Sequence, residues 1–326
     1  MDTAQQIHVI FGAGQVGSLL AKALLGRGLR VRLVRRSKQQ SDHPLLEVCS
    51  ADAYDAAQAK AAAAGATVVY QCTNAPYHQW PTLLAKLVLN VADAAQAAGA
   101  RLVVLDNLYM LGSLPSGPFR EDQPEQPCSK KGLIRKQISD ELRARQRRGE
   151  LAVVFGRASD FWGPGVEQGA IQHPRLLGQL ATGATVELMA DPDQLHSYAY
   201  APDVAEGLAI LGTRAQADGQ IWHLPMLPAR SSRAHLQAVA DQLGQPLKLR
   251  ILPRWLLTVA GWFSPMMGEL VEMMYQFDRP MIADSSRFCS EFSVQPTPFE
   301  EQARQTAAWI RARPTRQPSA NSAATA

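Results

Sequence analysis

The chain has 326 residues, a formal net charge of +4 and 46% hydrophobic residues, a composition typical of a globular protein with one large domain or two smaller ones. So small an excess of positive charge argues against a nucleic-acid partner. The four cysteines form no C-x-x-C pair and the seven histidines lack metal-ligand spacing, so we expect free thiols and no metal site.

Short apolar runs alternate with longer helix-like segments from the start of the chain. The expected strands are 7–11, 30–34, 45–52, 67–72, 101–107 and 150–156, and the expected helices are 16–28, 55–64, 80–99 and 129–142. This alternation predicts the α/β class with a doubly wound parallel sheet, a Rossmann fold. We expect 1–162 to form its core, 163–313 a smaller substrate-binding region intercalated with the last core strands, and 314–326 a disordered tail.

A glycine-rich turn joins the first expected strand to the first expected helix. Gly12, Gly14 and Gly17 have the spacing G-x-G-x-x-G in this strand–turn–helix context, which is typical of a dinucleotide site. The three glycines permit, in order, a tight turn, close approach to a pyrophosphate and close helix–strand packing. The helix start offers N–H groups to the anion, so Gln15 and Val16 join the predicted site. The alternative is a glycine turn without a nucleotide.

The end of the second expected strand indicates which dinucleotide binds. An acidic residue at this place accepts hydrogen bonds from the ribose of NAD, whereas here the strand ends in Arg35, Arg36 and Ser37. Two guanidinium groups and a hydroxyl suit a 2′-phosphate, so we expect NADP(H) in preference to NAD(H). The alternative is that both arginines are solvated. Asp52, after the third strand, is a candidate for the adenine amino group.

Ligand sites in such sheets lie at the carboxyl ends of the strands. Cys72, Thr73 and Asn74 follow the fourth expected strand and are therefore predicted to run past the cofactor. The same loop continues with Tyr77, His78 and Trp80, which are further candidates.

Several segments together resemble the NAD(P)-dependent epimerase/dehydratase family, the extended short-chain dehydrogenases. They are "NVADAAQAAGARLVVLDN", "LGSLPSGPFREDQPEQP", "VVFGRASDFWGPG", "SYAYAPDVAEGLAIL" and "SVQPTPFEEQARQTAAWIR", and the resemblance runs from about Ile7 to Arg311. It implies NAD(P)-dependent chemistry on a carbonyl or hydroxyl of a small molecule, with Arg157 in the segment beside the nicotinamide. The glycine spacing is similar to that of the atypical branch.

The chain departs from the family's pattern at the positions that carry catalysis. The family's active-site Ser/Thr position falls on Asn107, and its Tyr-Gly pair becomes Leu111-Gly112. Its Tyr-x-x-x-Lys motif falls on "SKKGLIRK", where Lys131 takes the tyrosine position and Arg135 the lysine position. The resemblance therefore implies a site without the usual phenol.

On a helix over 129–142, Lys131 projects toward the sheet, Arg135 lies on the flank of the apolar stripe, and Lys136 points to solvent. Three interpretations remain open. Lys131 is a general acid or base, or Lys131 and Arg135 bind the ribose or an anionic substrate group, or both are structural. Tyr109 is a candidate substitute proton donor.

Asp160 and His196 are weaker candidates near the same end, and the Met- and aromatic-rich segment 255–277 is expected to cover the substrate or to form a homodimer contact. We expect an NADP(H)-binding oxidoreductase or epimerase-like enzyme with a small-molecule substrate, for which an anionic group is one option. The alternative is a non-catalytic NADP-binding regulator or redox sensor. No signal peptide and no uninterrupted apolar run of spanning length is visible, so we expect a cytoplasmic protein without a membrane partner.

Overall fold

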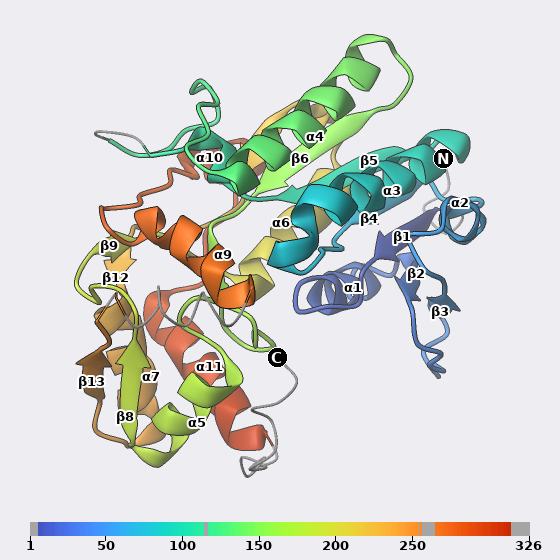
Figure 1. Ribbon diagram of the computed structural model, residues 1–326. Coiled ribbons are helices and arrows are strands. Elements are labelled where there is room, and N and C mark those ends of the chain that lie inside the picture. Colours follow the sequence, from blue (N-terminus) through green and yellow to red (C-terminus); the bar gives the residue numbers. More distant parts are fainter. Residues whose placement is uncertain (1–5, 114–116, 254, 256–264, 314–326) are drawn as a thin grey trace. The chain divides into compact units, whose positions relative to one another are not determined.

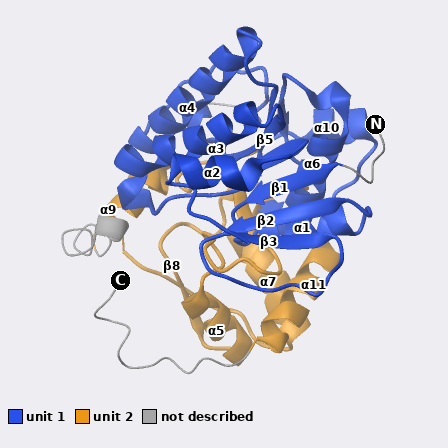
Figure 2. Cartoon of the chain, turned by 90° about the vertical axis from the view of Figure 1, so that its right-hand side faces the viewer, with its two compact units in different colours: residues 1–159, 199–226, 283–296 blue, residues 160–198, 227–282, 297–326 orange. Residues whose placement is uncertain are grey.

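The computed structural model describes residues 6–113, 117–253, 255 and 265–313. The chain divides into two compact units, coloured separately in Figure 2. Unit 1 comprises 1–159, 199–226 and 283–296, and unit 2 comprises 160–198, 227–282 and 297–326. The boundary at residue 162 that the sequence suggested stays a prediction. The tail 314–326 and residues 256–264 of the Met-rich segment lie outside the described residues.

Unit 1 contains the strands and helices that the sequence predicted between residues 7 and 156, together with further elements after them. Its strands are β1 (Ile7–Phe11), β2 (Arg30–Arg35), β3 (Leu46–Ser50), β4 (Val68–Gln71), β5 (Arg101–Asp106), β6 (Val153–Arg157) and β11 (Ile221–His223). Its helices are α1 (Gly17–Leu25), α2 (Ala56–Ala63), α3 (Ala85–Ala97), α4 (Lys130–Arg147), α6 (Ala201–Thr213) and α10 (Ser286–Phe292), with the short turns η2 (Tyr77–Gln79), η3 (Trp80–Leu84), η4 (Tyr109–Leu111) and η5 (Ala215–Ala217).

The seven strands of unit 1 form one parallel sheet in the order β11-β6-β5-β4-β1-β2-β3 (Figure 1). The helices α2, α3 and α4 lie side by side on one face, and α1 and α6 pack together on the other (Figure 2). The predicted doubly wound α/β fold is therefore confirmed. Successive connections reverse direction between β1 and β4, and ligands bind outside the carboxyl ends of the strands at such a switch point.

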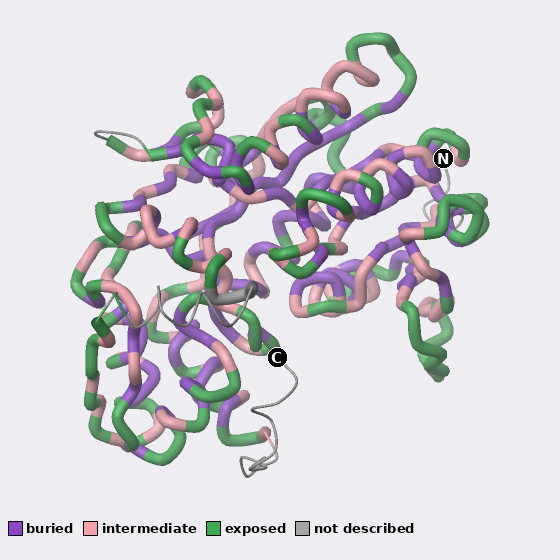
Figure 3. Tube along the Cα trace, in the orientation of Figure 1, coloured by how far each residue is buried: buried purple, intermediate pink, exposed green. Residues whose placement is uncertain are grey.

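The centre of the sheet is covered on both faces, so its strands are apolar on both sides rather than alternating. Every residue of β4 and β6 is buried, and Figure 3 shows the central strands of unit 1 in the colour of buried residues. His8 of β1 is fully buried and its Nδ1 lies 2.9 Å from the hydroxyl of Tyr70. Burial lowers the pKa of His8 to about 4, because desolvation disfavours the imidazolium.

In the residues that the structure describes, unit 2 is built from short strands and helices. Its elements are β7 (Asp160–Trp162), α5 (Pro174–Thr182), β8 (Thr185–Leu188), β9 (Leu195–His196), β12 (Arg230–Ser231), α7 (Ser232–Leu243), β13 (Lys248–Ile251), α9 (Pro265–Met273), η6 (Met274–Gln276) and α11 (Phe299–Ala312), while β10 (Tyr198–Tyr200) leads back to unit 1. β8 and β13 pair in parallel, and β9 and β12 antiparallel. Trp162 packs edge-on against His235 of α7, with ring centroids 4.5 Å apart.

No helix in the described part of the chain combines the length and the apolar character needed to cross a membrane. The same residues contain no group of three or more His, Cys, Asp or Glu side chains arranged to hold a metal ion.

Candidate functional site

The three glycines of the predicted phosphate turn meet different requirements. Gly12 has φ +105°, a conformation that L side chains rarely adopt, and a Cβ added at Gly17 would lie 1.8 Å from the carbonyl oxygen of Gly12. Both positions therefore need glycine for the turn itself. A Cβ at Gly14 would meet no atom of the described chain within 4 Å. Gly14 is therefore open to solvent, as close approach of a pyrophosphate to the backbone requires, so the turn fits the predicted cofactor. The contact itself stays a prediction.

The amino-terminal end of α1 faces this turn. The partial positive charge of the helix dipole at this end is not offset by a side chain of the described residues. Among the described residues no side chain caps α1 and no acidic residue lies in its first turn, whereas the carboxylate of Asp55 accepts hydrogen bonds from two amides at the start of α2. Val16 is buried, so it can reach a ligand only through its backbone, and Gln15 is half-buried. The amides and the dipole of α1 are thus available to an anion.

The residues that were predicted to read the ribose lie beside the glycine turn. The amide of Gly12 donates a hydrogen bond of 3.1 Å to the carbonyl of Val34, which brings the end of β2 alongside. Arg35 hydrogen-bonds Gln39 through Nη1, and its Nε is buried with no hydrogen-bond partner in the described chain. Arg36 and Ser37 are exposed. These donors can hold an anionic group next to the turn.

Asp52 lies two residues beyond β3 and is half-buried. One of its carboxylate oxygens accepts a hydrogen bond of 3.0 Å from the amide of Tyr54. The carboxylate keeps acceptor capacity for an adenine amino group, so its predicted role stays a prediction.

The end of β4 connects the glycine turn to the start of α4. The amide of Cys72 donates to the carbonyl of Phe11 at 2.9 Å, and a Cβ at Gly12 would touch the carbonyl oxygen of Cys72 at 2.8 Å. Thr73 is fixed through the side-chain amide of Gln71, which donates to its carbonyl and hydroxyl oxygens at 2.8 Å. The side-chain oxygen of Asn74, in turn, lies 3.5 Å from Nη2 of Arg135.

The basic helix start is held against η4 by a glycine. Ser129 caps α4 by accepting a hydrogen bond of 3.0 Å from the amide of Gly132. A Cβ at Gly132 would lie 2.4 Å from the carbonyl oxygen of Tyr109, so only glycine allows this approach. Lys131 is 1% exposed and Arg135 7%, whereas Lys136 is half-buried and pairs with Asp140 at 2.6 Å.

Lys131 and Arg135 enter a cluster of aromatic side chains. Nζ of Lys131 lies 5.3 Å from the centroid of the Tyr77 ring, and the guanidinium of Arg135 lies 4.7 Å from that of Trp80. The hydroxyl oxygens of Tyr77 and Tyr109 are hydrogen-bonded at 2.5 Å. The structure therefore brings the predicted candidates Tyr77, Trp80, Tyr109, Lys131 and Arg135 together.

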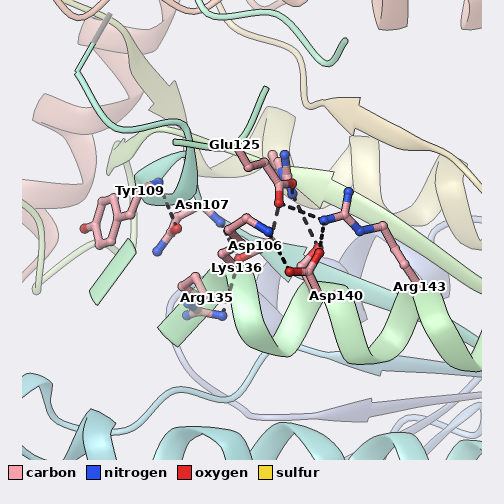
Figure 4. A network of polar contacts seen from close by, with 10 residues as sticks. Asp106, Asn107, Tyr109, Glu125, Arg135, Lys136, Asp140 and Arg143 are labelled. Carbon is pink, nitrogen blue, oxygen red and sulfur yellow. Dashed lines mark hydrogen bonds and ion pairs between the residues drawn. The ribbon is translucent and has the colours of Figure 1, made fainter. Parts of the chain in front are cut away.

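A network of buried charges lies behind this cluster (Figure 4). Nη1 of Arg135 lies 3.5 Å from Oδ1 of Asp106, and Nε of Arg157 lies 3.7 Å from Oδ2 of the same carboxylate. Arg157, fully buried, also pairs with Glu125 at 2.5 Å, and Glu125 pairs with Arg143 at 2.7 Å. The network links the end of β5, the start of α4 and the Pro-rich loop.

Two of the predicted cofactor contacts lie in or beside this network. Asn107 accepts a hydrogen bond of 3.1 Å from the amide of Tyr109 and so shapes η4 (Figure 4). The Arg157 guanidinium is directed at Glu125 and Asp106, while its Nε and Nη1 have no hydrogen-bond partner in the described chain. Contact of either residue with a nicotinamide stays a prediction.

The remaining candidates are His78, beside Tyr77 in η2, and the pair Asp160 and His196. His78 is exposed. In unit 2, Nε2 of His196 lies 2.8 Å from Oδ2 of Asp160, and its ring stacks on Phe277 with centroids 4.7 Å apart. These two residues form a pair within unit 2.

Sequence reasoning did not identify three residues that build the site. Gly132 stands in the first turn of a helix, where a glycine lowers helix propensity, and this cost was an available signal for close packing. Asp106 ends an apolar strand, which was a second signal. Glu125 lies in an irregular loop, and only the tertiary structure brings it to Arg157.

Comparison with known proteins shows the family. A family model described as "NAD dependent epimerase/dehydratase family" matches residues 8–224, about two thirds of the chain. No curated protein matches the chain.

Solved structures of low identity share the fold over nearly the whole chain. UDP-glucose 4-epimerase of Thermus thermophilus, in complex with NAD, is 19% identical with a TM-score of 0.74, covering 94% of this chain and 99% of that one. A double mutant of the dTDP-glucose 4,6-dehydratase DesIV of Streptomyces venezuelae, with NAD bound, is 18% identical with a TM-score of 0.74, covering 94% and 97%. UDP-N-acetylglucosamine 4-epimerase of Bacillus cereus is 14% identical with a TM-score of 0.75, covering 95% and 98%. By its family match, the chain belongs to the NAD-dependent epimerase/dehydratase family.

Proposed function

We propose that the protein is an NADP(H)-dependent oxidoreductase or epimerase-like enzyme that acts on a carbonyl or hydroxyl of a small molecule. The observation that carries the proposal is the open space at Gly14, between the uncapped start of α1 and the arginines at the end of β2. When bound there, the cofactor supplies or accepts a hydride. The glycine turn and the amides of α1 hold its pyrophosphate, and Arg35, Arg36 and Ser37 hold a 2′-phosphate.

The relatives support a substrate class as well as a cofactor class. All three solved structures described above belong to enzymes named for nucleotide sugars. A sugar nucleotide is anionic, and the buried cations Lys131 and Arg135 suit an anionic group. The resemblance places the family's Tyr-x-x-x-Lys motif at these two positions, so the proton that accompanies hydride transfer is proposed to come from Lys131, Tyr109 or a water rather than from that motif's phenol.

The proposal is tested by titrating NADPH and NADH into the purified protein and following the fluorescence of the nicotinamide. We expect NADPH to bind at least tenfold more tightly, which is about 1.4 kcal/mol. Replacing both Arg35 and Arg36 by alanine removes this preference and leaves NADH binding unchanged. Arg30→Ala, at the exposed other end of β2, is the matched control and changes neither affinity.

Equal affinity of the wild type for both nucleotides, or a preference that survives the double substitution, contradicts the assignment. Catalysis is tested separately, with NADPH oxidation measured against aldehydes, ketones and 4-keto sugar nucleotides. Tight NADPH binding without turnover of any of them favours a cofactor-binding regulator, in keeping with the replaced motif.

A further inference from the structure

Two tyrosines from separate turns share a short hydrogen bond in unit 1. Tyr77 lies in η2, after β4, and Tyr109 lies in η4, after β5. Their hydroxyl oxygens are 2.5 Å apart, which is the range of a bond between a hydroxyl and an ionised oxygen, about 2.5–2.7 Å. The distance is also at the short end of the range for two neutral hydroxyls, so it is compatible with a pair that shares one proton.

The rings are held in place by Trp80. This indole is 1% exposed, and its Nε1 donates a hydrogen bond of 2.8 Å to the carbonyl of Ala75. Tyr77 packs edge-on against it with centroids 5.0 Å apart, and Tyr109 stacks on it at 6.2 Å. The short contact between the hydroxyls is thus fixed by a rigid frame rather than by two flexible loops.

The charges around the pair favour loss of a proton. Nζ of Lys131 lies 5.3 Å from the centroid of the Tyr77 ring, inside a region where Lys131 is 1% exposed. Among the charged groups described nearby, Arg135 of α4 lies 3.5 Å from Asp106 of β5. Asp106 also faces Arg157 of β6, which pairs with Glu125, so these four charges offset one another. A cation close to a phenol, in a poorly hydrated place, stabilises the phenolate.

We propose that Tyr77 is the acid/base group of this protein, with Tyr109 and Lys131 as the residues that stabilise its phenolate. Tyr77 is half-buried, whereas Tyr109 is 9% exposed, so Tyr77 is the member of the pair that a substrate can meet. This inference rests on the proposed oxidoreductase function and supplies the group that the replaced Tyr-x-x-x-Lys motif lacks.

The proton balance is closed by the pair. In carbonyl reduction, the carbonyl carbon gains a hydride from the reduced nicotinamide cofactor, and the C=O π electrons move to the substrate oxygen. That oxygen takes the proton of Tyr77 Oη, so an alcohol forms and Tyr77 is left as the phenolate. The hydroxyl of Tyr109 donates its hydrogen bond to this phenolate, and Tyr77 regains a proton from water. Oxidation of an alcohol follows the same path in reverse.

The test is a pH titration of tyrosinate absorbance on the purified full-length protein, without substrate. An ordinary tyrosine has a pKa of about 10, and burial raises the pKa of Tyr54, Tyr70 and Tyr198. We expect one tyrosine of the seven to ionise at least one pH unit below the ordinary value. Tyr77→Phe abolishes this early step, and Tyr109→Phe and Lys131→Met each move it to higher pH.

Tyr54→Phe is the matched control and leaves the early step in place, because burial makes Tyr54 ionise late. Thermal unfolding of each variant confirms that it is folded. If the wild type shows no early step, or if the step persists in Tyr77→Phe, the inference is overturned. Its failure is distinct from that of the proposed function, since NADPH titration measures the glycine turn and the tyrosinate titration measures the phenol pair.

Discussion

The glycine turn and the start of α4 lie at the same edge of one sheet, yet they are specified in different ways. The turn is a local feature: Gly12 and Gly17 are required by atoms within a few residues or on a neighbouring strand, and Gly14 stays open. The α4 region takes Tyr77, Tyr109 and Lys131 from three separate segments. The turn can therefore be recognised from a short stretch of sequence, whereas the α4 region depends on contacts between segments that are far apart in the chain.

The largest expected effect on the free energy of unfolding comes from the network of buried charges near the start of α4. Arg157→Met leaves Glu125 and Asp106 with less compensation in the interior, so we expect the free energy of unfolding to fall by about 3 kcal/mol. Urea unfolding of unliganded protein measures it. Arg148→Met, in an exposed pair with Glu150, is the control. A loss below about 1 kcal/mol for Arg157→Met would show that the network is not a structural requirement of this end.

The next largest effect is a dependence of stability on pH, and it comes from His8 of β1, the strand that leads into the glycine turn. Burial lowers the pKa of His8 from 6.5 to about 4, so the unfolded chain binds its proton more readily than the folded chain does. The stability that the neutral imidazole of His8 contributes is fully present above pH 6.5 and is lost as the pH falls through about 4. At about pH 5 the loss from this histidine is about 2 kcal/mol.

Urea unfolding at about pH 7 and about pH 5 measures how much stability each protein loses on acidification. The difference in this loss between the wild type and His8→Gln is the contribution of His8. The wild type should lose more stability on acidification than the variant does. Equal losses would mean that the imidazole beneath the turn is not kept neutral by burial.

Gly14→Ala separates cofactor binding from folding at the turn. Because a Cβ there meets nothing within 4 Å in the described chain, we expect stability within about 0.5 kcal/mol of the wild type. The methyl group occupies the pyrophosphate cradle, so NADPH affinity should fall about tenfold, or about 1.4 kcal/mol. Unchanged NADPH affinity would place the cofactor elsewhere.

Gly17→Ala is the contrasting variant, measured with the same two assays. Its Cβ would lie 1.8 Å from the Gly12 carbonyl oxygen, so it should lower stability as well as binding.

The smallest effect is expected on the outer face of α4. Lys136 and Asp140 form an (i, i+4) pair in which the side chains are 32% and 48% exposed, and such pairs contribute about 0.3–0.5 kcal/mol. Lys136→Ala should therefore change the unfolding midpoint little and leave tyrosinate ionisation unchanged, in contrast to Lys131→Met. An effect of Lys136→Ala on the early tyrosinate step would mean that net charge, rather than the position of Lys131, controls the phenol pair.

Sequence reasoning succeeded for local features and failed for contacts between distant segments. The alternation of apolar runs and helical segments predicted the parallel sheet, and helical periodicity predicted that Lys131 faces inward. It placed Arg135 on a flank, whereas this residue is 7% exposed, because Asp106 and Trp80 receive its guanidinium. The contact between Tyr77 and Tyr109 joins residues 32 positions apart, and no local pattern encodes it.

The central claim is that the glycine turn and the phenol pair belong to one NADP(H)-dependent site. It is tested most directly by repeating the tyrosinate titration with saturating NADP⁺ and, as a control, with 2′-phospho-ADP-ribose, which lacks the nicotinamide. A positive nicotinamide near Tyr77 favours its phenolate, so NADP⁺ should move the early ionisation step to lower pH and the control nucleotide should not. An unchanged step in the presence of bound NADP⁺ would contradict the claim.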